Sequence, residues 1–261
     1  MRVPGRIYAD RPLAEMLLAD QPKAREWNAL LQVRNVACLP GIRGYSLAMA
    51  DIHPGYGFPI GGVGAFDTDE GVVTVAGVGF DCNCGVRALV APLDRADVEA
   101  RKAELAEALF RGVPAGIGSV GDFRLNRREI DEMLVEGAGF SVRRGYGTGA
   151  DLEFIEEGGC MRGADPANVS DRAKGRQLRQ VGTLGSGNHY LEVQYVDEIY
   201  DADAAGAFGI ERGAVVISVH TGSRALGHQV GTDYLPKLKA AARKYGLQVR
   251  EQELVCAPIG S

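Results

Sequence analysis

The side chains in this sequence best suited to metal chemistry lie in short segments framed by glycine. Asp81 and Cys84 occur in VGFDCNCGVRAL, His189 follows GTLGSGN, and His220 and His228 occur in VISVHTGSRALGHQ. The chain has only four histidines, and three of them fall in the last two segments. Carboxylate, thiolate and imidazole are the groups that bind borderline divalent ions. We therefore predict that folding gathers Asp81, Cys84, His189 and His220 into a metal site.

Each of these residues also has an ordinary explanation when taken alone. An aspartate three residues before a cysteine is more often a turn cap beside a small buried thiol. A histidine at the end of an apolar strand can be a core residue whose nitrogens are satisfied by neighbours. Two such histidines in matched glycine-rich contexts, together with Asp81 and Cys84, favour the metal site. His228 remains open as a group behind the ligands or a surface residue.

The glycine-rich segment before His189 also invites comparison with phosphate-binding loops. GTLGSGNH can offer several backbone amides to an anion. It lacks the G-K-[ST] ending of a Walker A loop, and an alternating strand pattern rather than a helix follows it. The loop alone is therefore weak support for nucleotide binding.

Composition bounds the class of protein. The chain has 261 residues with 46% hydrophobic and 24% charged residues, which is typical of a soluble globular protein. We see no apolar run near the roughly 20 residues of a membrane helix and no apolar signal core at the N-terminus. The chain has five cysteines, and two of them, Cys82 and Cys84, are separated by a single residue. This pattern argues against a disulfide framework and for a reduced, cytoplasmic protein. We predict a single domain over residues 1–261 that is truncated at its C-terminus, where the apolar ELVCAPIGS enters a turn.

The net charge gives little support to a protein that coats nucleic acid without sequence preference. The formal net charge is −5, whereas such coats are usually basic. A local basic run lies within residues 162–179, with a further arginine pair just upstream. Composition alone favours a solvated loop for this run.

The apolar pattern predicts the strands that must place the metal-binding side chains. Short strands are predicted at Val36–Leu39, Tyr45–Ala50, Val72–Val75, Val86–Ala91, Tyr190–Val196 and Ala214–Val219. The FDCNCG turn then falls between two buried strands, and His189 and His220 lie at strand ends. A glycine- and proline-rich loop, DIHPGYGFPIGGVG, carries His53.

Helices are predicted between and before these strands. Residues 11–35 read as one or two amphipathic helices, with Pro22 starting the second. Further helices are predicted from a cap at Asp94 or Asp97 through Phe110, over Asn126–Glu136, and in Arg224–Tyr245, where a loop comes before the helix. Residues 137–180 read as a charged excursion from the core. Without a regular βαβ alternation, the pattern indicates an α+β fold.

At these motifs the sequence resembles the RtcB family of RNA-splicing ligases. Four long segments carry the resemblance: ADIHPGYGFPIGGVGAF, GVGFDCNCGVR, VGTLGSGNHYLEVQ and SVHTGSRALGHQV. The final ELVCAPIGS also fits. The resemblance implies an RtcB-like α+β fold of stacked mixed and antiparallel β-sheets flanked by helices.

The resemblance also implies a reaction. Such enzymes use GTP and Mn²⁺ to join RNA ends with a 2′,3′-cyclic phosphate or 3′-phosphate to ends with a 5′-hydroxyl. A histidine is guanylylated first, GMP passes to the RNA 3′-phosphate, and the 5′-hydroxyl displaces it. Expected substrates include tRNA halves, and an archease-type activating protein is a further expected partner. A thiolate suits Mn²⁺ poorly by hardness alone, so the choice of metal partly reflects availability.

By motif position, the resemblance assigns roles to individual residues. Asp81, Cys84, His189 and His220 are expected to bind two Mn²⁺ ions, with the Cys84 thiolate bridging them. Asn188, Glu192 and His189 are expected near the guanine nucleotide, and Arg224 and His53 near the substrate phosphate. The guanylylated histidine of the family is expected beyond Ser261, so this chain alone is expected to lack ligase activity. A catalytically inactive RNA-binding or regulatory homologue, and a metal-dependent phosphodiesterase, remain open as alternatives.

Overall fold

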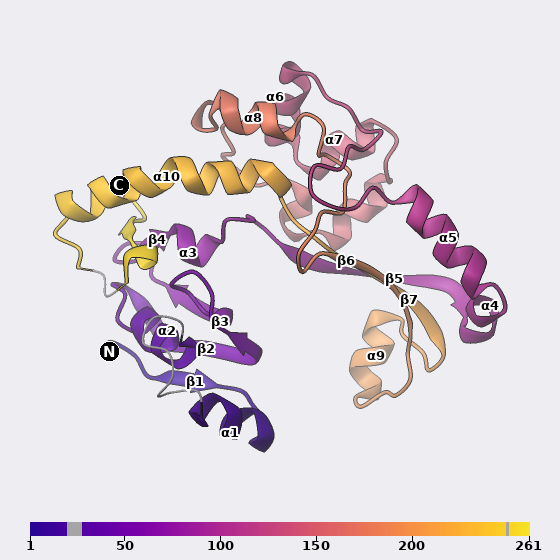
Figure 1. The fold of residues 1–261 in the computed structure, drawn as a ribbon, viewed down its shortest axis with the longest axis horizontal. Helices are drawn as coiled ribbons and strands as arrows, with labels where there is room; N and C mark the ends of the chain where they lie inside the picture. The colour runs from indigo at the N-terminus through magenta and orange to yellow at the C-terminus, as the bar shows by residue number, and fades with distance from the viewer. Residues whose placement is uncertain (20–27, 249–250) are drawn as a thin grey trace. The chain divides into compact units, whose positions relative to one another are not determined.

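The computed structural model describes residues 1–19, 28–248 and 251–261, and it divides into two compact units (Figure 1). Unit 1 comprises Met1–Phe80 and Val230–Ser261, and unit 2 comprises Asp81–Gln229. Helices and short sheets alternate irregularly in both, which confirms the predicted α+β class. The helix start predicted at Pro22 lies outside the described residues.

Unit 1 contains a mixed sheet and a two-stranded sheet. The mixed sheet has the order β1 (Gly5–Ile7), β2 (Ile42–His53), β3 (Ile60–Phe66), with β1 parallel and β3 antiparallel to β2. The second sheet pairs β4 (Val72–Thr74) with β8 (Cys256–Pro258) in antiparallel register. The strands predicted at Tyr45–Ala50 and Val72–Val75 are therefore present.

Short helices pack on these sheets, and one replaces a predicted strand. They are α1 (Arg11–Ala19), α2 (Ala29–Val36), α3 (Val75–Val78) and the single turn η4 (Gln252–Leu254). The strand predicted at Val36–Leu39 is wrong, because Val36 ends α2 and a turn follows. Both side chains are buried, at 0% and 3% exposure, in a core shared with β2, β4 and β8. The apolar run reflects burial of a helix end rather than strand pairing.

Unit 2 is built on a three-stranded antiparallel sheet. Its order is β5 (Gly85–Asp94), β7 (Ala214–Thr221), β6 (Tyr190–Tyr195). The strands predicted at Val86–Ala91, Tyr190–Val196 and Ala214–Val219 are all present, but β5 is exposed along most of its length rather than buried as predicted. The central strand, β7, thus comes last of these three strands in the chain and pairs with a strand more than a hundred residues earlier.

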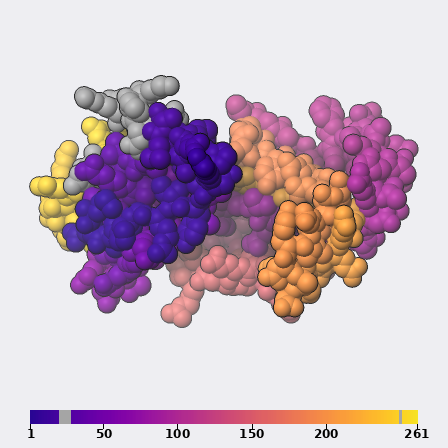
Figure 2. All heavy atoms as spheres, turned by 90° about the horizontal axis from the view of Figure 1, so that it is seen from below, coloured from indigo at the N-terminus to yellow at the C-terminus, as the bar shows by residue number. Residues whose placement is uncertain are grey.

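The helices described in unit 2 start at a polar side-chain cap in four of six cases, and the helix predicted through Phe110 is broken at Arg101. They are α4 (Arg95–Ala100), α5 (Lys102–Gly112), α6 (Arg127–Glu136), α7 (Ala138–Arg143), α8 (Asp171–Gln177) and α9 (Ala202–Phe208). Asp94 and Asp97 cap each other's backbone at the start of α4, and Asn126 caps α6. The surface of the α9 segment is orange in Figure 2.

Residues 137–180 are an excursion from the core only in their middle part, because residues 143–172 are exposed or half-buried while the two ends of the segment reach the core. Single 3₁₀ turns at η1 (Gly149–Phe154), η2 (Glu156–Gly159) and η3 (Pro166–Asn168) lie between α7 and α8. Phe140 and Ala173 are fully buried, and Phe140 joins a core cluster with Phe123, Leu125 and Ile130. This segment therefore supplies part of the core of unit 2. Among the described residues, no helix combines the length and apolarity that crossing a bilayer requires.

Candidate metal centre

Strand register brings three of the predicted ligands to one end of the sheet in unit 2. His220 in β7 pairs with Val86 of β5 on one side and with Tyr190 of β6 on the other. Cys84 directly precedes β5, and His189 directly precedes β6. The three residues therefore meet although they are far apart in the sequence.

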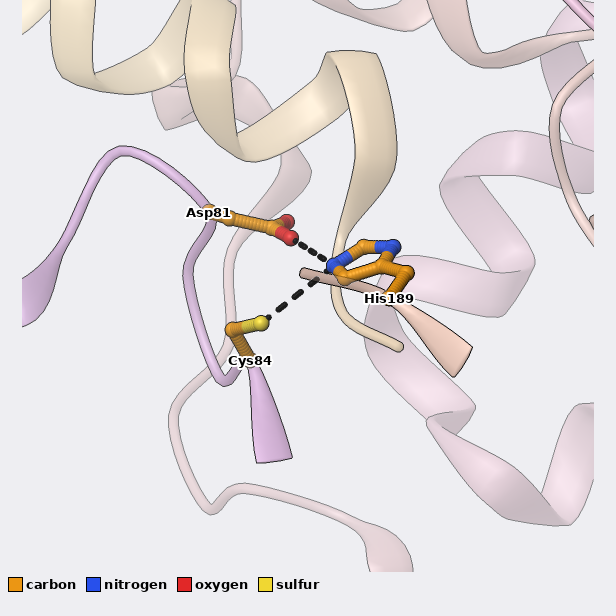
Figure 3. Close-up of side chains that lie close together, drawn as sticks. All are labelled: Asp81, Cys84 and His189. Carbon is orange, nitrogen blue, oxygen red and sulfur yellow. Dashed lines mark hydrogen bonds and ion pairs between the residues drawn. The ribbon is translucent and has the colours of Figure 1, made fainter. Parts of the chain in front are cut away.

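Asp81, Cys84 and His189 form a cluster whose ligand atoms lie within 4.8 Å of one another (Figure 3). His189 Nε2 is 2.7 Å from Asp81 Oδ2 and 3.3 Å from Cys84 Sγ. His220 joins through the thiol, since its Nε2 lies 3.1 Å from Cys84 Sγ. The sulfur is thus the shared neighbour of both imidazoles.

A backbone carbonyl fixes the orientation of His189. Its Nδ1 lies 2.7 Å from the carbonyl oxygen of Leu184, so Nδ1 carries the proton and Nε2 faces Asp81 and Cys84. The Thr221 hydroxyl donates to the same carbonyl at 2.8 Å. Gly185 is required beside this contact, because it adopts a φ of +108° and a Cβ there would lie 2.3 Å from His189 Nδ1.

The carboxylate of Asp81 is held by the segment that follows β7. Oδ1 accepts from the Ser223 hydroxyl at 2.9 Å and from the Arg224 backbone N–H at 3.0 Å. A Cβ on Gly222 would lie 2.7 Å from both carboxylate oxygens, so glycine leaves the space that the carboxylate fills. With Oδ1 occupied in this way, Oδ2 is directed toward His189.

Helix α10 (Arg224–Lys244) starts directly at this carboxylate. The prediction of a loop at the start of Arg224–Tyr245 is therefore wrong. The helix can start there because Asp81 accepts the first of its N–H groups, and its positive end stabilises that negative charge. Arg224 adopts a φ of +55°, an uncommon conformation for a residue with a side chain. Its guanidinium donates to Thr183 Oγ1 at 3.1 Å and to the Gly116 carbonyl at 3.3 Å.

The environment of Cys84 disfavours the thiolate in the metal-free protein. Desolvation of the sulfur, followed by the nearby charge and hydrogen bond of Asp81, raises the pKa of the Cys84 thiol from 9.0 to about 11. At neutral pH the group is therefore a protonated thiol. A metal ion that binds here must displace this proton, which couples binding to pH.

The remaining predicted site residues lie in different surroundings. Asn188 is exposed in the turn before His189, and Glu192 is exposed on β6, where it accepts from the Gln194 side chain at 2.7 Å. His53 is exposed at the end of β2 in unit 1, with Nδ1 2.8 Å from the Asp51 carbonyl. His228 is exposed on α10. These contacts do not test the nucleotide and phosphate roles expected of Asn188, Glu192 and His53, so those roles stay predictions.

Several residues that shape the centre are not among the predicted site residues. Ser223 could have been predicted, because it lies in the HTGSR segment that begins at His220, and its hydroxyl binds Asp81. The Leu184 carbonyl could not, because a backbone acceptor has no residue signature. Gln177 and Gln180, whose side chains accept from the first turn of α10, also lack a local pattern.

The fold and the cluster define an α+β protein with a candidate Asp/Cys/His metal centre at the strand ends of an antiparallel sheet. Comparison with known proteins gives the family. A family model described as tRNA-splicing ligase RtcB matches residues 32–261, and the chain belongs to this family.

The relatives are similar over the whole chain. It is 52% identical over 261 residues to the tRNA-splicing ligase RtcB of Thermococcus kodakarensis, covering 100% of this chain and 53% of that protein. It is 51% identical over 261 residues to the corresponding protein of Methanococcus maripaludis, with coverage of 100% and 53%. It is 50% identical over 234 residues to the RNA-splicing ligase RtcB of Mycobacterium tuberculosis, covering 88% of this chain and 54% of that protein. The chain spans about half the length of the curated relatives it matches.

Proposed function

We propose that this chain forms the metal-binding and nucleotide-binding part of a GTP- and Mn²⁺-dependent RNA ligase. Its substrates are RNA ends with a 2′,3′-cyclic phosphate or 3′-phosphate and ends with a 5′-hydroxyl, tRNA halves among them. The observation that carries the proposal is the convergence of Asp81, Cys84 and His189, with His220 Nε2 also 3.1 Å from the sulfur. Membership of a family whose relatives are named RNA-splicing ligases supports the RNA substrate.

The donor set fits one or two divalent ions. Asp81 Oδ2, Cys84 Sγ and His189 Nε2 already face one another, and the Leu184 carbonyl holds His189 in the tautomer that a ligand needs. His220 and Cys84 would hold the second ion. When bound, such ions supply positive charge that orients phosphates and offsets charge developing in an in-line displacement.

The protein's own groups then position the substrates. Arg224 has guanidinium N–H groups beyond those that bond to Thr183 and Gly116, and a planar guanidinium suits a terminal phosphate. We assign Asn188 and Glu192 to the guanine nucleotide and His53 to the substrate phosphate. An archease-type protein is the proposed activating partner, and the cytoplasm is the proposed location.

Cobalt binding tests the metal centre directly. Co²⁺ added to the purified chain should give a sulfur-to-metal charge-transfer band, which Cys84→Ser abolishes. Cys160→Ser is the matched control, because Cys160 is another exposed free cysteine, bonded to the Val135 carbonyl. A band that survives in Cys84→Ser, or one lost in Cys160→Ser, contradicts the assignment.

Labelling with GTP tests whether any histidine of this chain is the nucleophile that accepts GMP. We propose that none of the four histidines present accepts GMP, because the family's nucleophile segment has no counterpart among their motifs. After incubation with labelled GTP and Mn²⁺, denaturing electrophoresis should show no acid-labile label at the mass of the chain. A labelled band would show that one of these four histidines is the nucleophile.

A further inference from the structure

The first turn of α10 receives its hydrogen-bond acceptors from three distant side chains of unit 2. The Arg224 N–H donates to Asp81 Oδ1 at 3.0 Å, and the Ala225 N–H donates to Gln180 Oε1 at 3.2 Å. The Leu226 N–H donates to Gln177 Oε1, also at 3.2 Å. The first N–H groups of a helix have no partner inside the helix, so the site of these acceptors determines where the helix can begin.

The two glutamines belong to a part of the unit that packs against its core. Gln177 ends α8 and is 5% exposed, and its carbonyl accepts from the Gln180 N–H at 2.8 Å. Leu178 and Val181, which flank Gln180, pack against the buried cluster around Phe140. A further hydrogen bond to α10 lies one turn along the helix, where Arg176 Nη1 donates to Gln229 Oε1 at 2.8 Å. The acceptors are thus anchored to the core rather than to the helix that they hold.

The position of this first turn decides where the Asp81 carboxylate points. Both donors to Oδ1 come from the start of α10, namely the Ser223 hydroxyl and the Arg224 N–H. A shift of the turn would carry these donors away and free the carboxylate to rotate. Oδ2 would then lose its place 2.7 Å from His189 Nε2.

The chemistry of the two acceptors also suits this role. Among the three side chains that cap the turn, Asp81 is the one anion, because an amide oxygen accepts an N–H without carrying charge. A buried leucine at position 177 would leave the Leu226 N–H without its acceptor.

We propose that Gln177 and Gln180 are positioning residues for the metal centre. By holding the first turn of α10, they fix the Asp81 carboxylate with Oδ2 toward His189. The segment that carries them continues to Leu184, whose carbonyl fixes the His189 ring, so one stretch of chain orients both ligands. The inference rests on the proposed function of Asp81 and His189 as metal ligands.

The test compares two substitutions of Gln180, which is half-buried and tolerates change better than Gln177. Gln180→Met keeps the length of the side chain and removes the oxygen acceptor, whereas Gln180→Glu keeps the acceptor. The readout is the affinity of the full chain for Co²⁺, followed by the charge-transfer band. Gln180→Met should weaken binding about tenfold, as loss of a group behind a metal ligand does, while Gln180→Glu stays within about threefold of the unsubstituted chain. Gln194→Met, an exposed glutamine on β6, should change nothing.

The outcomes separate this inference from the proposed function. If the unsubstituted chain binds no Co²⁺, the metal centre itself is wrong. If it binds and Gln180→Met binds equally well, or if Gln180→Glu is as weak as Gln180→Met, the positioning role is overturned. Metal-free melting temperatures show whether Gln180→Met folds. Should it unfold, Gln180→Asn takes its place, because a side chain one methylene shorter keeps the amide but withdraws it from the Ala225 N–H. Unchanged affinity in that variant also overturns the proposal.

Discussion

Replacement of Gly222 by alanine should damage the metal centre without a general effect on folding. Gly222 does not adopt a left-handed φ, so alanine fits the backbone. Its Cβ would nevertheless lie 2.7 Å from both oxygens of Asp81, whereas ordinary contact starts at 3.4 Å, so the carboxylate must retreat by about 0.7 Å. Such a shift takes the 3.0 Å contact between Oδ1 and the Arg224 N–H out of hydrogen-bonding range.

The size of the effect follows from that lost contact. A hydrogen bond to a charged group contributes roughly 1.5–3 kcal/mol, which corresponds to roughly 10- to 150-fold in metal affinity. The assay is a Co²⁺ titration of the metal-free chain, with melting temperature measured alongside. Gly206→Ala is the matched control, since Gly206 lies in α9 and no atom lies within 4 Å of its added Cβ. Equal affinities of Gly222→Ala and the unsubstituted chain would refute the placement of Asp81 as a ligand.

Three further predictions concern charge. Because the pKa of the Cys84 thiol is raised to about 11, metal binding must release its proton, and Co²⁺ affinity should rise about tenfold per pH unit between pH 6 and 8 in titrations at several pH values. The Asp67 carboxyl has its pKa lowered from 3.8 to about 2, first by the Glu70 backbone N–H and then by Arg43. Its contribution to stability is therefore present above pH 3.8 and lost as pH falls toward 2, so acid unfolding of Asp67→Asn should show a weaker pH dependence in this window. Arg224→Ala should weaken binding of RNA with a 3′-phosphate more than RNA with a 3′-hydroxyl, by roughly 1.5–3 kcal/mol in a fluorescence titration, and equal losses for both ends would reduce Arg224 to a nonspecific charge.

Local rules predicted the elements whose causes are local. Asn126 caps α6 through the N–H three residues later, which a sequence pattern reveals directly. Strand β6, which begins directly after His189, and strand β7, which contains His220, follow from short apolar runs near glycines. The convergence of Asp81, Cys84 and His189 was predictable only as a hypothesis, because rarity and context suggested a site but could not give its distances.

Element boundaries whose causes lie far away in the sequence are predicted wrongly. Helix α10 begins at Arg224 because Gln177 and Gln180 accept its N–H groups, and nothing near Arg224 announces those partners. The helix also contains Pro236, which local rules treat as a breaker. Val36 was assigned to a strand because an apolar run does not distinguish a buried helix end from a buried strand.

The pairing of β5 with β7 has a consequence for the order of folding. The contacts between Cys84 and the two histidines join positions that are 105 and 136 residues apart. Contacts of such separation close large loops and form late, after local helices such as α6. We therefore expect an ion that binds these residues to meet a completed sheet, unlike the ion of a zinc finger, which organises an otherwise unfolded chain. Metal uptake would then report that unit 2 has reached its native topology, and chelation should remove the ion while leaving the sheet in place.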